Sequence, residues 1–302
     1  MRDIAMIAEI TWKHSIGVVM VTLLASTVAN AIVIRPDVAD TRYRVREHSF
    51  PALVDLPGEG HGVLIARLWV VTAAHATQGY SLDHVDINGT RRDVAELIVH
   101  PDFRKLPEGP ASGDAGSLME NLAAMTDIAL IRLTQPVDDV TPVQRYQGWN
   151  EQGKLAQIYG KGATGNGTLG QYPKAPHRDA LRRATNRIES AHAQWLDYRF
   201  DCDAHATALE GVMGDGDSGS PVLIREDGEW KLAGLADWKH WQGDLSTFRA
   251  GICGQTFSNS RISYYATWID GVIRARSGNR RNHCSQVNRK WCRSSRLDGD
   301  PR

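Results

Sequence analysis

The chain lacks any surplus of charge: its 302 residues carry 35 Lys and Arg against 35 Asp and Glu, so the formal net charge is zero. Binding to nucleic acid or an anionic membrane through bulk charge needs a basic surplus, so no nucleic-acid partner is expected. Cysteine is also scarce, with four residues that allow three pairings. The most apolar segment, residues 15–29, is shorter than the roughly 20 residues that a membrane span usually needs.

Helical periodicity is sparse too. Short apolar runs broken by Gly, Pro and Asp recur through residues 50–265, and this pattern is typical of an all-β protein. Residues 104–121 are polar and rich in Pro and Gly, so we expect a surface loop there.

Residues 1–31 have the layout of a secretory signal peptide. A polar start precedes the apolar core at 15–29, and Ala29-Asn30-Ala31 is a small-x-small cleavage pattern. We therefore predict cleavage after Ala31 and an exported protein, either periplasmic or extracellular. An uncleaved membrane anchor is the alternative.

The run GDGDSGSPV at residues 214–222 places Ser218 between glycines and just before an apolar run. A serine hydroxyl becomes a nucleophile when a base takes its proton and backbone N–H groups stabilise the oxyanion that forms. Glycines allow a loop to turn its N–H groups toward one point. A surface β-turn is the other interpretation, because Gly, Asp and Ser also dominate turns.

A base and a group that could orient it are both present. His75 ends the apolar run LWVVTAAH, and Asp127 begins the apolar run DIALIRL. A buried carboxylate can accept the Nδ1–H of a histidine and hold the tautomer whose Nε2 faces a serine. Each residue alone has a structural explanation, but together the segments predict a catalytic triad of His75, Asp127 and Ser218.

The three segments resemble the signature segments of the trypsin/chymotrypsin-like serine proteases, whose triad has the same chain order. Residues 158–162 (IYGKG), 232–238 (LAGLADW) and 260–269 also resemble segments of that family. The resemblance covers residues 32 to about 275. It implies an all-β fold of two antiparallel six-stranded β-barrels with a short C-terminal helix, and an active site between the barrels.

The resemblance also implies roles for the loop around Ser218. The oxyanion donors would be the backbone N–H groups of Gly216 and Ser218. A free N-terminal amine at Ile32, released by signal cleavage, would pair with the carboxylate of Asp217, since a buried carboxylate needs a partner. The residues after Val33 are not the family's usual glycines, so an ordinary strand or a further cut downstream are the alternatives.

Substrate binding is implied for Val212, Asp237, Trp238 and Lys239. Val212 stands at the base of the family's specificity pocket, so the acidic base that favours Arg and Lys is missing there. Lys239 would narrow the pocket or attract an acidic or small side chain, whereas the nearby Glu210 and Asp215 could favour a basic one. We expect a specificity other than that of trypsin.

Asp237 departs from the family pattern, which usually has there a serine bonded to the catalytic aspartate. A second carboxylate near Asp127 would raise a pKa or share a proton. Such a carboxylate would either tune the basicity of His75 or impair its function as a base.

Disulfides are the default state of cysteines in an exported protein. We expect Cys202–Cys253 in the second barrel and Cys284–Cys292 in the tail. A metal site around the tail cysteines would have too few ligands, so no metal is expected, and the triad chemistry needs no organic cofactor.

The chain accordingly divides into a signal peptide (1–31), an N-terminal barrel (32–150), a C-terminal barrel with a helix (151–273) and a basic tail (274–302). The tail carries nine Lys or Arg and two Asp. Such runs are usually solvated, and a tether to an anionic surface is the functional alternative.

The sequence thus predicts an exported serine endopeptidase that hydrolyses polypeptides through an acyl-enzyme intermediate. A catalytically silent homologue that acts as a binding module is the alternative. It is favoured by Asp237 and by Ser220, which stands where the family usually has a second glycine after the nucleophile.

Overall fold

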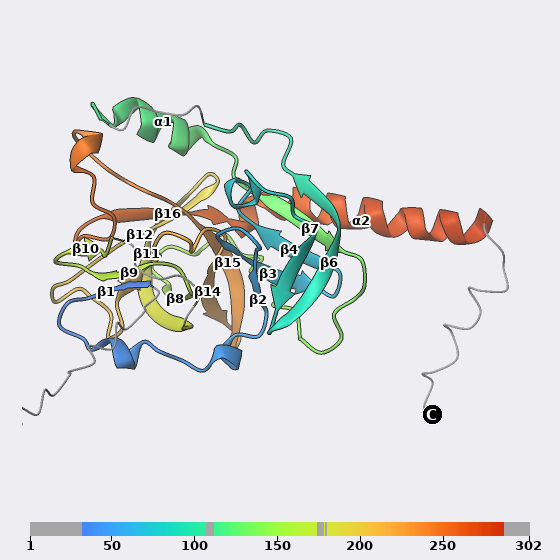
Figure 1. Cartoon of the computed structure of the whole chain (residues 1–302), viewed down its shortest axis with the longest axis horizontal. Helices are drawn as coiled ribbons and strands as arrows, with labels where there is room; N and C mark the ends of the chain where they lie inside the picture. The colour runs from blue at the N-terminus through green and yellow to red at the C-terminus, as the bar shows by residue number, and fades with distance from the viewer. Residues whose placement is uncertain (1–31, 107–111, 174–177, 179, 287–302) are drawn as a thin grey trace, which may run out of the picture.

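The computed structural model describes residues 32–106, 112–173, 178 and 180–286, and of residues 278–286 only the backbone. The predicted signal peptide lies outside the described residues, as does the predicted tail beyond residue 286. Within the described part, most elements are strands, and they form two barrels that lie side by side (Figure 1).

The first barrel closes in the order β2-β3-β4-β7-β6-β5, with antiparallel pairing throughout. Its strands are β2 (Leu53–Asp55), β3 (His61–Ala66), β4 (Trp69–Thr72), β5 (His84–Ile87), β6 (Thr90–Val99) and β7 (Ala129–Leu133). The β-branched and aliphatic residues of β4 and β7 are almost all buried, so these two strands lie at the centre of the barrel core.

The second barrel closes in the order β11-β12-β16-β15-β14-β8, again antiparallel. Its strands are β8 (Leu155–Gly160), β11 (Arg182–His192), β12 (Trp195–Arg199), β14 (Pro221–Glu226), β15 (Glu229–Lys239) and β16 (Thr256–Arg261). Burial alternates along the first half of β11, as expected when successive side chains face the barrel interior and the outside. The predicted fold class of two six-stranded antiparallel barrels is confirmed.

A small four-stranded sheet joins the start of the described chain to the second barrel. Its order is β10 (Gly170–Gln171), β9 (Thr164–Asn166), β1 (Ile32–Ile34) and β13 (Gly211–Val212). All three residues of β1 are buried, and they belong to the same hydrophobic cluster as the core of the second barrel.

Two α-helices and four short 3₁₀ helices complete the described part: α1 (Gly116–Ala124), α2 (Ile262–Gln286), η1 (Asp40–Arg42), η2 (Glu47–Ser49), η3 (His75–Thr77) and η4 (Leu245–Thr247). None of the helices in the described residues is long and apolar enough to cross a membrane.

Helix α2 is longer than the short C-terminal helix that was predicted, and it continues to residue 286, inside the predicted tail. Its first half packs apolar side chains against the first barrel's core. Two ion pairs then hold it to the barrels: Arg145–Asp270, and Arg276 with Glu96 of β6 at 2.9 Å.

Helix α1 corrects the prediction of a plain surface loop over 104–121, because its first residues fall in that range. The helix is held by contacts that are distant in sequence. The amide of Ala115 donates to Gly243 O at 3.0 Å, and the indole of Trp195 donates to Ala123 O at 2.8 Å. This segment, which precedes β7 of the first barrel, is thereby fastened at both ends to the second barrel: to the loop after β15 and to the start of β12.

Candidate active site

Strand register brings the predicted base and its carboxylate together. His75 lies just after β4 and Asp127 just before β7, and these antiparallel strands pair with Thr72 opposite Ala129. Residues that follow β4 and residues that precede β7 therefore lie at the same end of the first barrel. Ser218 lies just before β14 of the second barrel, so the three side chains meet between the barrels.

A continuous chain of hydrogen bonds joins the three side chains. His75 Nε2 lies 2.7 Å from Ser218 Oγ, and His75 Nδ1 lies 2.6 Å from Asp127 Oδ2. The backbone N–H of His75 also donates to Asp127 Oδ1, at 2.8 Å. Since Asp127 is acceptor-only when ionised, Nδ1 carries the imidazole proton and Nε2 is left to accept the serine proton.

Burial and charge shift the pKa values of His75 and Asp127 in opposite directions. Burial lowers the pKa of His75, but the charge of Asp127 and their hydrogen bond raise it, and the net shift is upward. Burial raises the pKa of Asp127, but the charge and hydrogen bonds of His75 outweigh it, and the pKa of that carboxyl is lowered. The geometry therefore favours an ionised aspartate and a more basic histidine.

Asp237 contacts the pair from a nearly buried position at the edge of the cleft. Its side chain is 1% exposed, its Oδ2 accepts a hydrogen bond from Ser260 Oγ at 2.7 Å, and its Oδ1 lies 3.9 Å from His75 Nδ1. Burial and the charge of Asp127 raise the pKa of Asp237 well above its ordinary value. The expected second carboxylate beside Asp127 is thus in contact with the histidine.

The loop before β14 presents two unused backbone donors. Gly216 has a φ of +83°, a conformation that glycine adopts without strain. Asp217 is fully buried and accepts hydrogen bonds from the amides of Gly162 at 2.7 Å and Gly214 at 2.9 Å. Among the described residues, no acceptor takes the amide protons of Gly216 or Ser218.

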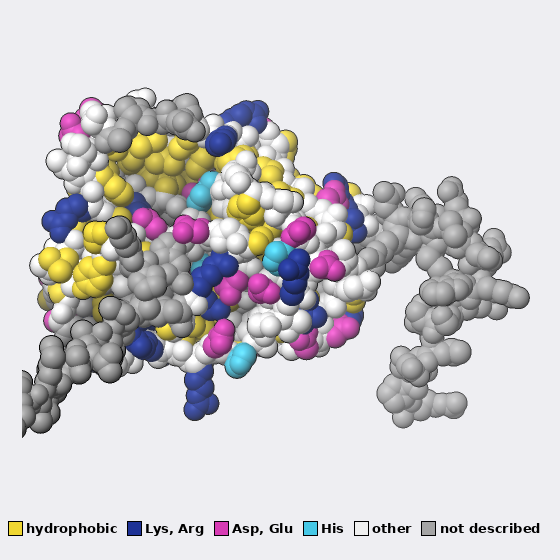
Figure 2. Space-filling model, viewed as in Figure 1, with side chains coloured by type: hydrophobic (Ala, Val, Ile, Leu, Met, Phe, Trp, Pro, Cys, Tyr) yellow, Lys and Arg dark blue, Asp and Glu magenta, His cyan; other side chains and the backbone are white. Residues whose placement is uncertain are grey.

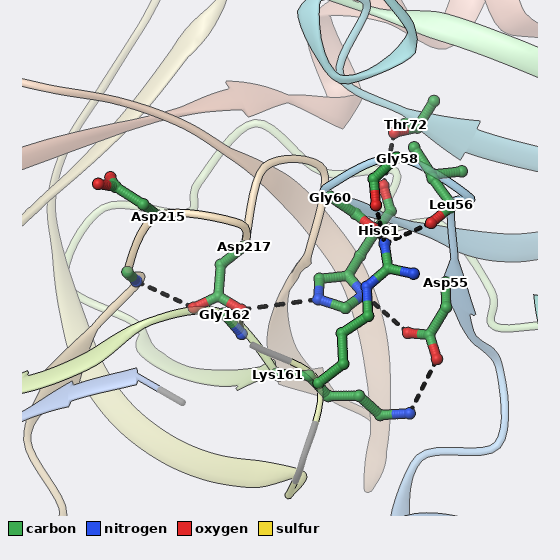
Figure 3. Close-up of polar contacts among 12 residues, drawn as sticks. Asp55, Leu56, Gly58, Gly60, His61, Thr72, Lys161, Gly162, Asp215 and Asp217 are labelled. Carbon is green, nitrogen blue, oxygen red and sulfur yellow. Dashed lines mark hydrogen bonds and ion pairs between the residues drawn. The ribbon is translucent and has the colours of Figure 1, made fainter. Parts of the chain in front are cut away.

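Sequence reasoning missed His61, which supports this loop from the first barrel (Figure 3). Its amide donates to Ser218 O at 2.7 Å, and its fully buried ring lies with Nε2 3.8 Å from Asp217 and Nδ1 3.0 Å from Asp55. Lys161 Nζ contacts the other oxygen of Asp55 at 3.0 Å. No local sequence signal marks this set, because its members come from both barrels.

The predicted pairing of Ile32 with Asp217 stays a prediction. Ile32 is fully buried in β1, and its carbonyl accepts a hydrogen bond from Thr164 Oγ1 at 3.0 Å. Its nitrogen is part of a peptide bond to residue 31 in the full chain, so it carries no free amine. Burial raises the pKa of Asp217, and the charge of His61 together with the amide donors opposes that shift.

A cleft of about 410 Å³ adjoins Ser218, and Figure 2 shows a hollow with mainly hydrophobic walls next to α1. Its apolar lining comes from α1, from the segment after β15 and from the second barrel: Leu118, Met119, Leu122, Trp241, Leu245, Phe248, Met213, Trp238 and Phe257. A second recess, of about 310 Å³, is lined in part by His75 and shares Leu122, Asp237 and Trp238 with the first.

The predicted substrate-binding residues differ in where they lie. Asp237, Trp238 and Lys239 line the cleft beside Ser218. Val212 does not: it is fully buried in β13 and pairs with β1, and Met213 lines the cleft instead. The strand register explains the correction, since it turns Val212 into the core.

Two predicted specificity residues, Lys239 and Glu210, have partners within the chain. Lys239 Nζ is ion-paired with Asp215 Oδ1. Glu210 lies outside the cleft lining, where Thr207 N donates to its side chain at 2.8 Å, and burial raises its pKa to about 7.

One disulfide, Cys202–Cys253, is present in the described residues, as predicted. The predicted Cys284–Cys292 pair lies outside the described side chains.

His75, Asp127 and Asp237 each offer an atom within 4.8 Å of the other two. Because His75 and Asp127 are already bonded to each other, the set is not a free metal site, and the expectation of cofactor-free chemistry stays a prediction.

Comparison with known proteins agrees with this geometry. The family model described as Trypsin matches residues 41–269. Chymotrypsin-like elastase family member 1 of Canis lupus familiaris is 25% identical over 267 residues, which cover 78% of this chain and 95% of that protein. Vitamin K-dependent protein C of Mus musculus is 25% identical over 242 residues, covering 70% of this chain and 45% of the relative.

The chain spans less than half the length of the first curated relatives that it matches. A solved structure of neuropsin, a serine protease expressed in the limbic system of mouse brain, has a similar fold. Its TM-score is 0.56 at 23% identity, over 76% of this chain and 98% of that one. With a family model that matches most of its length and two barrels that meet at the His–Asp–Ser cluster, the chain belongs to the trypsin family.

Proposed function

We propose that the protein is a serine endopeptidase. One observation carries the proposal: the hydrogen-bonded series Asp127–His75–Ser218 ends beside two backbone amides, of Gly216 and Ser218, that have no acceptor in the described residues. Unused amide donors near a nucleophile are the arrangement that stabilises a developing oxyanion.

The proposed reaction uses only these groups. Ser218 Oγ attacks the scissile carbonyl carbon while its proton moves to His75 Nε2, and the oxyanion accepts hydrogen bonds from the Gly216 and Ser218 amides. The imidazolium, stabilised by the Asp127 carboxylate, then donates its proton to the leaving amine. The acyl ester on Ser218 is hydrolysed by a water molecule that gives its proton to His75 in the same way.

Covalent labelling with a fluorophosphonate tests the proposal without knowledge of the substrate. We expect one label per chain, located on Ser218 by peptide mapping, and none on Ser218→Ala. Ser220→Ala is the matched control, because Ser220 belongs to the same loop but its hydroxyl is buried and has no partner in the described residues. Labelling of Ser218→Ala at the parental rate would contradict the assignment.

The alternative is a catalytically silent homologue that binds polypeptides. An absence of labelling in both the parent and Ser218→Ala, in protein that is folded, would favour this alternative. The short Nε2–Oγ distance of 2.7 Å favours the enzyme, since a base must lie within hydrogen-bond reach of the proton that it abstracts.

For specificity, we propose a preference for apolar side chains before the scissile bond. The cleft walls are mainly apolar, and Lys239 and Asp215 are paired with each other, which weakens the attraction of either charge for a substrate side chain of opposite sign. A peptide-library digest tests this preference. Cleavage mainly after Arg or Lys would overturn it.

The proposal includes export after removal of residues 1–31, with Ile32 as the mature N-terminus pairing with Asp217. The buried position of β1 in the sheet with β13 supports this pairing. N-terminal sequencing of active protein is the test, and a mature start well past Ile32 would exclude it.

A tether to an anionic surface through residues 274–302 is also proposed, and a salt-sensitive association lost on truncation after Ile273 would support it.

A further inference from the structure

The carboxyl group of Asp237 has an unusual environment. Its Oδ2 accepts from Ser260 Oγ at 2.7 Å, but no donor among the described residues reaches its buried Oδ1. The nearest charged groups are His75 Nδ1, at 3.9 Å from Oδ1, and the carboxylate of Asp127. A buried carboxylate oxygen with no donor is costly, whereas a protonated one can donate.

Only one of the two carboxyl groups has the donors that an ionised form needs. Asp127 accepts two N–H donors from His75, at 2.6 and 2.8 Å. Asp237 accepts at most one hydrogen bond, from the Ser260 hydroxyl. That hydroxyl has a second possible acceptor, the Asp127 carbonyl oxygen at 2.8 Å. Two ionised carboxylates side by side in a buried site repel each other. The single proton that the pair must hold therefore belongs on Asp237.

We propose that Asp237 is a positioning residue, which holds a proton at neutral pH and donates its Oδ1–H to the Asp127 carboxylate. Asp127 then has a third donor, which fixes the carboxylate that orients His75. The inference rests on the proposed hydrolase function, because positioning of His75 matters for catalysis only if His75 is the base.

The charged and titratable groups around Asp237 are His75 in η3, Asp127 before β7 and Tyr265 in α2; Lys239, two residues further along β15, acts on His75. Of these, Asp127 is the nearest negative charge, and it opposes ionisation of Asp237. Because burial and this charge raise the pKa of Asp237, the folded protein binds a proton that the unfolded chain releases. The contribution of this group to stability is therefore present at acidic pH and is lost as the pH rises.

Asp237→Asn tests the inference, because its amide N–H can donate where the proposed O–H donates and cannot ionise. Asp237→Ala removes the donor, and Asp237→Ser is a second donor variant in case the asparagine fails to fold. Asp227→Asn, in an exposed turn, controls for the loss of one carboxyl. Three measurements are needed: the infrared difference spectrum of parent minus Asp237→Asn, thermal stability against pH, and kcat/KM against pH.

We expect a protonated-carboxyl C=O band near neutral pH in the difference spectrum, and none with Asp227→Asn. The Tm of Asp237→Asn minus the Tm of the parent should increase as the pH rises from about 5 to about 9. At neutral pH its kcat/KM should stay within about threefold of the parent, while Asp237→Ala loses about tenfold or more. At alkaline pH the parent should lose activity that Asp237→Asn retains.

Absence of the infrared band, or equal losses in Asp237→Asn and Asp237→Ala, would overturn the inference. The spectrum and the Tm need no turnover. An inactive protein that shows the band would therefore refute the hydrolase while leaving the protonated Asp237 established.

Discussion

Gly219 is the residue whose replacement tests the geometry around Ser218 most directly. Its φ is +79°, and a Cβ placed there would lie 2.5 Å from Thr72 Oγ1, 3.1 Å from Ala73 N and closer still to the carbonyl oxygen of His61. Ordinary carbon contacts are about 3.5 Å, so Gly219→Ala must move the loop by about 1 Å. His61 and Ala73 contribute backbone atoms, which cannot rotate away.

The displacement reaches the nucleophile, because Gly219 is covalently next to Ser218. A misplacement of about 1 Å can lower a catalysed rate about 100-fold, so we expect a fluorophosphonate labelling rate constant about 100-fold below the parent. The left-handed backbone of an alanine adds a loss of about 1–2 kcal/mol in the free energy of unfolding.

Gly228→Ala is the matched control. Gly228 has a φ of +84° and lies in an exposed turn, and no atom beyond its two chain neighbours would lie within 4 Å of an added Cβ. This variant should lose about 1–2 kcal/mol in the free energy of unfolding and label at the parental rate. Parental labelling by Gly219→Ala, or equal slowing in both variants, would refute the reasoning.

Three further predictions concern pH dependence and stability. The net shift of the His75 pKa is upward from 6.5. The labelling rate should therefore fall with decreasing pH, with a midpoint above pH 6.5, as the imidazole takes up a proton. A midpoint below pH 6.5 would contradict the pairing of His75 with Asp127. Replacing both Cys202 and Cys253 by alanine opens a loop of 51 residues and should lower the free energy of unfolding by about 4 kcal/mol in urea titrations. The carboxylate of Glu151 lies 2.7 Å from the buried Arg261 guanidinium, and Glu151→Ala removes this counter-ion. The variant should lose about 3–5 kcal/mol in the free energy of unfolding. For either stability prediction, an unchanged unfolding midpoint would be the contradicting result.

Local sequence determined the chemistry of the site and the class of the fold. Ser218 among glycines, and His75 and Asp127 at the ends of apolar runs, can be read directly because strand ends, turns and nucleophile loops depend on neighbouring residues. Short apolar runs indicated an all-β protein, the family resemblance implied the two barrels, and the Cys202–Cys253 pairing was also expected correctly.

Only the tertiary structure decided how distant segments modify that site. Strand register turned Val212 into the core and left Met213 in the cleft, Asp215 became the ion-pair partner of Lys239, and helix α1 became one wall of the cleft beside Ser218. The buried Asp237 oxygen that lies near His75 without a donor was also invisible in the sequence. Each of these features depends on contacts between residues far apart in the chain, and a sequence pattern reports the residue types but not which of them the fold brings within a few ångströms.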